Sequence, residues 1–189
     1  MYVFQGVLLS EELDVLKLVA QILDEQEISY MITGSIAANY YTIPRMTRDI
    51  DVIVELHSDV IDNTYTAFKS EFYIDRQMIS EAIAKQSSFN IIHNKTLVKV
   101  DFIVKKDSEY RREEFGRRKR VEIDEASINI TAPEDLIISK LYWAKDSHSE
   151  MQLRDVKNLS EDLCNINRPY LEKWVKKLGL EKIYEEALK

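Results

Sequence analysis

The chain has 189 residues, of which 45% are hydrophobic and 31% are charged, and its net charge is −7. This size suits one domain with a sizeable core, and the acidic charge argues against unspecific binding to nucleic acid. No run approaches the ~18 consecutive apolar residues of a membrane span, and the N-terminus lacks a secretory signal pattern. We therefore expect a cytoplasmic protein with no membrane partner.

Cysteine and histidine give little sign of function. The single cysteine, Cys164, excludes an internal disulfide and a cysteine-rich zinc site, and we expect it to be a small hydrophobic residue on a helix. His57, His93 and His148 are scattered without the spacing of metal ligands.

The first 131 residues alternate between helix and strand patterns. The predicted elements are a helix from Ser10, a strand over 30–33, a helix from Ser35 to about Tyr41, a strand over 49–54, helices over 58–71 and 77–86 with a short strand at 72–74, and hairpins over 89–104 and 121–130. From Pro133 the pattern is helical, with further helices over about 150–163, 168–178 and 180–188. This predicts an α/β (α+β) core over 1–131 and a helical part over 132–189 packed on it. Tyr142, Trp143 and Trp174 lie at helical positions and are expected in the core or between helices.

The most informative stretch is the predicted strand that begins Asp49-Ile50-Asp51. Alternation places both carboxylates on one face, with Cα atoms ~6.6–7 Å apart. Such a pair could hold one divalent cation, or two at the ~3.5–4 Å separation of two-metal sites. The alternative is a solvated strand end whose acids cap a turn.

Gly34-Ser35 follows the first predicted strand and opens a helix. A glycine lets the backbone approach a phosphate, and the serine hydroxyl and helix N-terminus can donate hydrogen bonds to it. This turn, followed by a carboxylate pair on the next strand, is the layout of a nucleotide-phosphate site.

Asp101 is a single acid within the apolar strand pattern Lys99–Val104. A carboxylate there is costly unless it is paired or bound to metal. If this strand neighbours strand 49–54, three carboxylates converge. The alternative is an ion pair of Asp101 with Lys99 or Arg48.

Together these residues suit transfer of a nucleotidyl group. Asp49 and Asp51 would hold Mg²⁺ or Mn²⁺ on the triphosphate, and Asp101 would complete the metal site and draw the proton from the attacking hydroxyl. Arg45 and Arg48 flank the preceding loop, and either could reach a phosphate. Arg48 is the candidate nucleotide-binding residue, although it could instead balance the acids.

These motifs resemble the signature of the DNA polymerase β-like nucleotidyltransferase superfamily. The runs Thr131–Leu141, with its "PEDL…K" pattern, and Leu153–Val156, with its "RD" pattern, are most similar to small bacterial AbiEii-type toxin nucleotidyltransferases. The resemblance implies a short mixed sheet with the acids at one edge, a helical C-terminal part, and roles for Lys140 and Asp155, with Lys140 touching the triphosphate. The structural alternatives are a rim lysine at Lys140 and, for Asp155 beside Arg154, membership of a helix-surface ion pair.

The segment 105–120 holds eight basic and four acidic side chains. Glu113 and Glu114 could pair with Arg117 and Arg118 at four-residue spacing, which favours a solvated face over contact with a polyanion.

We therefore expect a Mg²⁺-dependent enzyme that moves an NMP group from an NTP, such as ATP, to a hydroxyl of RNA, protein or a small molecule. The competing hypothesis is a non-catalytic nucleotide-binding or partner-binding module of a toxin–antitoxin-like pair, with a partner protein.

Overall fold

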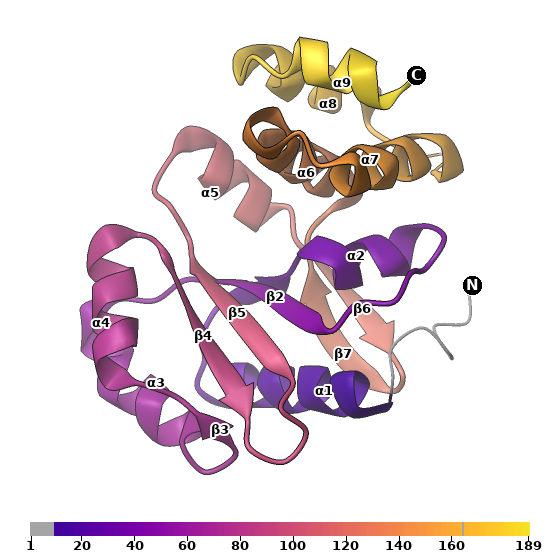
Figure 1. Cartoon of the computed structure of the whole chain (residues 1–189). Coiled ribbons are helices and arrows are strands. Elements are labelled where there is room, and N and C mark those ends of the chain that lie inside the picture. The colour runs from indigo at the N-terminus through magenta and orange to yellow at the C-terminus, as the bar shows by residue number, and fades with distance from the viewer. Residues whose placement is uncertain (1–9, 164) are drawn as a thin grey trace.

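The computed structural model describes residues 10–163 and 165–189, so Cys164 and its predicted place in the core lie outside the described residues. A mixed seven-stranded sheet forms the centre (Figure 1). Its strands are β1 (Tyr30–Ile32), β2 (Asp49–Val54), β3 (Phe72–Tyr73), β4 (Ser88–His93), β5 (Lys99–Val104), β6 (Lys119–Ile123) and β7 (Ala126–Ile130). In space they follow the order β3-β4-β5-β2-β1-β7-β6. The pairs β2–β5 and β1–β7 are parallel and the others antiparallel, which confirms the predicted mixed α/β fold.

The helices surround this sheet. They are α1 (Ser10–Glu25), α2 (Gly34–Tyr41), α3 (Ile61–Phe68) after a short 3₁₀ turn, α4 (Arg76–Lys85), α5 (Glu109–Gly116), α6 (Pro133–Ser147), α7 (Glu150–Asp162), α8 (Arg168–Lys177) and α9 (Glu181–Ala187). All were predicted except α5, because its charged sequence has only a short apolar stripe. The last four helices gather at one end of the molecule, beyond α2 and α5 (Figure 1). A domain boundary at residue 131, in the turn between β7 and α6, stays a prediction.

Strand alternation separates the two faces of the sheet. Ile50, Val52 and Val54 of β2 are fully buried, and they join α1, α3 and α4 in one apolar core. The opposite face carries the odd-numbered residues, including Asp51. A second apolar core lies among α6 to α9 and α2, so this end of the sheet is closed by helices from both halves of the chain.

Of the three aromatic residues predicted to pack internally, only Trp174 does so, with 1% of its surface exposed. Tyr142 and Trp143 are 49% and 65% exposed, so their prediction is wrong. The reason is the orientation of α6: Leu141 and Ala144 face the second core, which turns the two residues between them outward.

Ion pairs within the molecule use most of the charge of the basic segment. The pairs are Lys105–Glu55, Arg111–Glu114, Arg112–Asp107, Arg117 with Glu134 and Asp135, and Arg120–Asp24. The predicted pairing of Arg117 and Arg118 with Glu113 and Glu114 is wrong, because α5 ends at Gly116 and the helical spacing is lost there. Arg118 instead donates to the Phe115 carbonyl oxygen.

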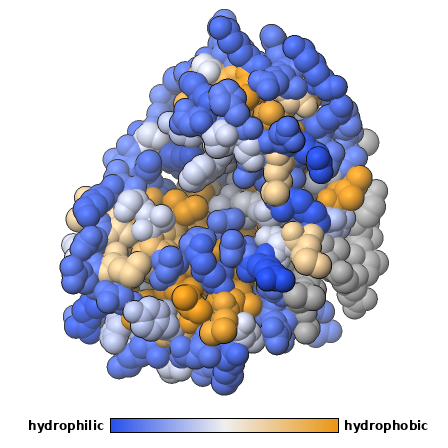
Figure 2. All heavy atoms as spheres, in the orientation of Figure 1, coloured by the Kyte–Doolittle hydropathy of each residue, from blue (hydrophilic) through white to orange (hydrophobic). Residues whose placement is uncertain are grey.

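The face of the molecule in Figure 2 is mostly hydrophilic, with apolar atoms in separate patches. Within the described ranges, no helix has both the length and the apolar character to cross a membrane.

Candidate active site

The register of β2 and β5 brings the predicted carboxylates together. Asp51 lies opposite Asp101 and Asp49 lies opposite Lys99 on these parallel strands. Side chains opposite one another on neighbouring strands share a face of the sheet. The predicted adjacency of the two strands is therefore confirmed. All three acids lie on the face of the sheet opposite the apolar core that contains α1, α3 and α4.

Lys99 takes part in this acidic group. Its Nζ lies 2.7 Å from Oδ2 of Asp101, so one of the two predicted ion-pair alternatives is present. The hydrogen bond to Asp101 raises the pKa of Lys99, and the charges of Asp49 and Asp51 act in the same direction. A cation thus already sits beside the third carboxylate.

The pKa of Asp51 is raised by its surroundings. Burial raises its pKa from 3.8 to about 6, and the negative charges of Asp101 and Asp49 contribute in the same direction. Lys140 and Lys99 oppose this rise without cancelling it. Close carboxylates repel one another, so a cation bound here would be strongly favoured.

Gly34, the first residue of α2, lies directly against Asp51. Its φ of +63° is in the left-handed region, and a Cβ at this position would come within 2.0 Å of Oδ2 of Asp51. The backbone N–H of Thr33 donates to the Asp51 carbonyl oxygen at 2.9 Å. Glycine is therefore required on both conformational and steric grounds, and it brings the start of α2 against the carboxylate.

Arg45 links the loop before β2 to the helical part. Its Nε and Nη2 donate to the two carboxylate oxygens of Asp155 at 3.2 and 3.1 Å, and Nη2 also donates to the Ser35 hydroxyl at 2.6 Å. Asn39 holds the loop in place through two hydrogen bonds with the Arg45 backbone, at 2.7 and 3.0 Å. Of these two arginines the sequence favoured Arg48 as the nucleotide-binding residue, but Arg45 is the inward residue and Arg48 is exposed.

Lys140 is 3% exposed and donates to Asp155 at 2.6 Å and to Gln152 at 3.1 Å. Burial lowers the pKa of Lys140, although Asp155 opposes the change. Burial alone would raise the pKa of Asp155, but the hydrogen bond from Arg45 and the charge of Lys140 lower it below its usual value. The alternatives of a rim lysine at Lys140 and of a helix-surface ion pair at Asp155 are therefore wrong, because both side chains are buried.

A cavity of about 250 Å³ lies between the acidic group on the sheet and the group formed by Arg45, Lys140 and Asp155. Its walls include Gly34, Asp51, Lys140, Gln152 and Trp143. Gln152 and Trp143 were missed by sequence reasoning. The signal for Gln152 was its three-residue spacing from Asp155, which places both on one face of α7. Asn90, opposite Asp101 on β4, was also missed because its position depends on the hairpin register.

The acids have the donor chemistry for a hard divalent cation, since Mg²⁺ prefers carboxylate oxygens. Among the residues that the structure describes, no three His, Cys, Asp or Glu side chains converge closely enough to form a ready metal cage. Asp101 is turned onto Lys99. Asp49 and Asp51, two residues apart on one face of β2, are the residues that would hold a cation, and Asp101 would join them by exchanging its partner.

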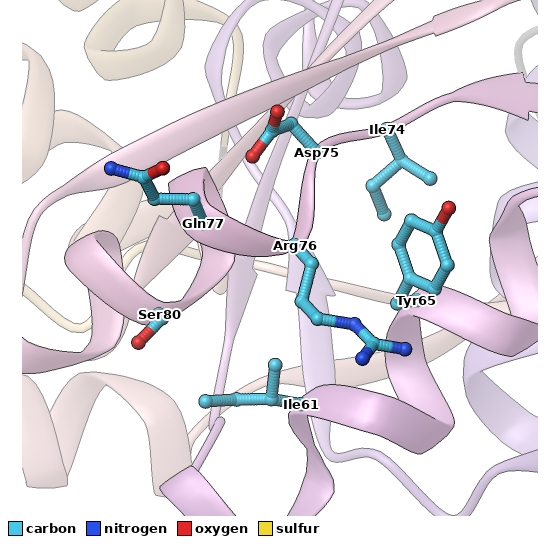
Figure 3. A pocket seen from close by; sticks show the side chains of 7 residues that line it. All are labelled: Ile61, Tyr65, Ile74, Asp75, Arg76, Gln77 and Ser80. Atoms are coloured by element: carbon cyan, nitrogen blue, oxygen red, sulfur yellow. The ribbon is translucent and has the colours of Figure 1, made fainter.

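A larger and more open hollow of about 710 Å³ lies between α3 and α4 (Figure 3). Its one carboxylate, Asp75, caps α4 by accepting from the Met78 N–H at 3.0 Å. Its Arg76 lies over the Tyr65 ring and pairs with Asp62 at 3.3 Å. These walls belong to helices that cover the opposite face of the sheet from Asp51, so the smaller cavity is the one at the reactive groups.

Solved structures of a nucleotidyltransferase-like protein and of an adenylyltransferase share this fold. A nucleotidyltransferase-like antigenic protein of Paracoccidioides brasiliensis has a TM-score of 0.58 and 19% identity, covering 96% of this chain and 94% of its own. A lincosamide antibiotic adenylyltransferase, solved with lincomycin bound, has a TM-score of 0.54 and 11% identity, covering 84% of this chain and 100% of its own. At such identities the likeness extends to the fold alone.

No curated protein matches the chain. The family described as "Nucleotidyl transferase of unknown function (DUF2204)" matches residues 12–185, which include every candidate site residue above. The chain therefore belongs to this family of nucleotidyl transferases.

Proposed function

We propose that the protein transfers an NMP group from an NTP to a hydroxyl acceptor, with Mg²⁺ or Mn²⁺ as its cofactor. One observation carries the proposal: Asp51 and Asp101 are in register on parallel strands, and Asp51 lies directly against the glycine that opens α2. A carboxylate pair and a helix N-terminus at one cavity match the opposite needs of a metal and a triphosphate.

The residues divide into two groups. Asp49, Asp51 and Asp101 are the proposed metal and catalytic residues. Gly34, Ser35 and Lys140 are the proposed triphosphate contacts, with Arg45 and Asp155 holding Ser35 and Lys140 in position. Arg48 lies at the surface and could meet the outer part of a bound nucleotide. The bound cation would neutralise the charge that develops on the phosphates.

In the proposed step, the acceptor oxygen forms a bond to the α-phosphorus. The bond from that phosphorus to the oxygen shared with the β-phosphate breaks, and pyrophosphate leaves. Asp101 takes the proton of the acceptor hydroxyl, which requires its carboxylate to be released from Lys99. Lys99 is then free to face the phosphates.

The class of acceptor is the finer part of the proposal. Among proteins of this fold, one was solved with lincomycin and another with adenylyl-2″-tobramycin, both of them small molecules. RNA and protein side chains are the other candidates. The motifs shared with AbiEii-type proteins favour that branch of the superfamily, in a bacterial cytoplasm, because their lysine and aspartate correspond to Lys140 and Asp155.

The test uses each of the four NTPs, labelled at the α-phosphate and incubated with the protein, Mg²⁺ and separated lysate fractions. We expect label in one acceptor fraction, pyrophosphate release, and loss of both in Asp51→Asn. The proposal is wrong if Asp51→Asn labels the fraction as well as the wild type does. Binding of NTP without any transfer would instead favour the non-catalytic module.

A further inference from the structure

A second cavity, of about 430 Å³, adjoins the cavity at Asp51. Thr33, Ile103, Ser139 and Trp143 line both of them. Ile103 follows Asp101 by two residues, so it lies on the same face of the sheet and one step further along β5. A molecule bound at the carboxylates can therefore continue into this second space.

Two aromatic side chains form part of the wall of the second cavity. Trp143 and Tyr142 of α6 both line it, and both are largely exposed. The chain has two tryptophans, and the other, Trp174, is buried. An exposed indole at the mouth of a cavity offers a flat face on which a ring can stack.

Two of the three basic side chains that line this cavity, Arg111 and Lys105, are paired with carboxylates; the third, Lys106, is exposed, and the acid Asp146 also lines the wall. Arg111 donates to both oxygens of Glu114, at 2.9 and 2.7 Å, and to the Ser139 hydroxyl at 3.0 Å. Lys105 pairs with Glu55. Most of the positive charge of this cavity is therefore used within the protein. The neighbouring cavity offers a phosphate the amine of Lys140, which shares the carboxylate of Asp155 with Arg45, and the start of α2 at Gly34.

Size and charge together indicate which part of a nucleotide each of the two cavities could hold. A volume of about 430 Å³ lies within the ~300–1,000 Å³ range of small-molecule sites and can hold a nucleoside. We propose that this cavity binds the base of the NTP donor, stacked on Trp143, while the triphosphate lies in the adjoining cavity at Gly34 and Lys140. This inference rests on the proposed function and names the residue that would hold the nucleoside.

The first test measures tryptophan fluorescence with α,β-methylene-ATP, which cannot release pyrophosphate, in the presence of Mg²⁺. We expect saturable quenching in the wild type, with the same midpoint as calorimetric binding. In Trp143→Phe, the remaining emission comes from buried Trp174 and should not respond. Inorganic tripolyphosphate should bind without quenching, because it lacks a ring. Nucleotide binding that leaves Trp143 emission unchanged would overturn the inference.

The second test compares the affinities of variants. Loss of a stacked base typically costs ~1–3 kcal/mol, so Trp143→Ala should weaken α,β-methylene-ATP binding by about 5- to 150-fold. Tripolyphosphate affinity should change by less than about twofold. Tyr73→Ala is the matched control, since Tyr73 is 64% exposed on the distant strand β3. It should bind both ligands as the wild type does.

The results separate this inference from the proposed function. If the wild type binds neither α,β-methylene-ATP nor tripolyphosphate, the proposed function fails and the inference fails with it. If both bind and Trp143→Ala weakens neither, or weakens both equally, only the inference fails. It also fails if Trp143→Ala raises the KM for an acceptor without changing nucleotide affinity, because the cavity would then serve the acceptor.

Discussion

Two charged groups meet at one cavity and are balanced in opposite ways. On the sheet, Asp49, Asp51 and Asp101 share one face with Lys99 as the neighbouring cation, and the pKa of Asp51 rises to about 6. Between the loop and the helices, Asp155 is bound by both Arg45 and Lys140, and its pKa falls. The first group has excess negative charge, and the second has each buried charge paired.

The difference separates a site for a ligand from a structural link. Like charges held close together oppose folding and favour the binding of a cation. A buried charge with its partners in place stabilises only as long as every partner remains. Substitutions in the two groups should therefore have opposite effects on stability.

The largest effect is expected on activity. Asp51→Asn removes a proposed metal ligand at the centre of the acidic group, and nucleotidyl transfer should fall by about 10³-fold or more. The metal-free variant should unfold at a higher temperature than the wild type, because repulsion is relieved. Added Mg²⁺ and NTP should stabilise the wild type alone. Thermal unfolding with and without Mg²⁺ and NTP measures the two effects on stability, and transfer of labelled nucleotide measures the activity. A metal-free variant that is less stable than the metal-free wild type would contradict the comparison.

Asp155→Ala should instead destabilise the protein. It leaves the buried Lys140 amine without its carboxylate, and breaking a buried pair costs about 3–5 kcal/mol. Urea denaturation measures the change in free energy of unfolding. Arg154→Ala, at the adjacent exposed residue, is the control and should stay within about 0.5 kcal/mol. Equal losses of unfolding free energy in Asp155→Ala and Arg154→Ala would mean that Asp155 and its two cationic partners do not stabilise the fold as a buried link.

Gly34→Ala tests the contact between α2 and the acidic group. The positive φ and the close approach to Asp51 should together cost about 1–2 kcal/mol, and displacement of Asp51 should reduce transfer further. Gly116→Ala is the control, because a Cβ there meets nothing within 4 Å. It should be neutral or slightly stabilising. A fully active Gly34→Ala protein would show that the close packing is not needed.

The smallest effect concerns pH in metal-free protein. The folded-state pKa of Asp51, about 6, lies above its ordinary value of 3.8, so the folded state binds the proton more tightly. This contribution is present below about pH 4 and is lost as the pH rises to about 6. In EDTA, the gain in unfolding free energy from Asp51→Asn should grow across this interval and then level off. A constant difference would exclude the raised pKa.

Local patterns predicted most of the fold. The alternation in Asp49–Val54 correctly placed two acids on one face and three apolar residues in the core. The turn at Gly34 correctly opened a helix. The charged helix α5 was missed, and Trp143 was placed in the core although it is exposed, because helical spacing alone does not show which side of α6 meets a partner.

The sequence by itself determined which face of each strand carries acids and where a glycine-opened helix begins, because these depend on periods of two to four residues. Only the tertiary structure decided that β2 lies beside β5, that Arg45 rather than Arg48 turns inward, and that Lys140 is buried. Arg45 and Asp155 are 110 residues apart in sequence. Such contacts are selected by the packing of whole elements, which local periodicity does not encode.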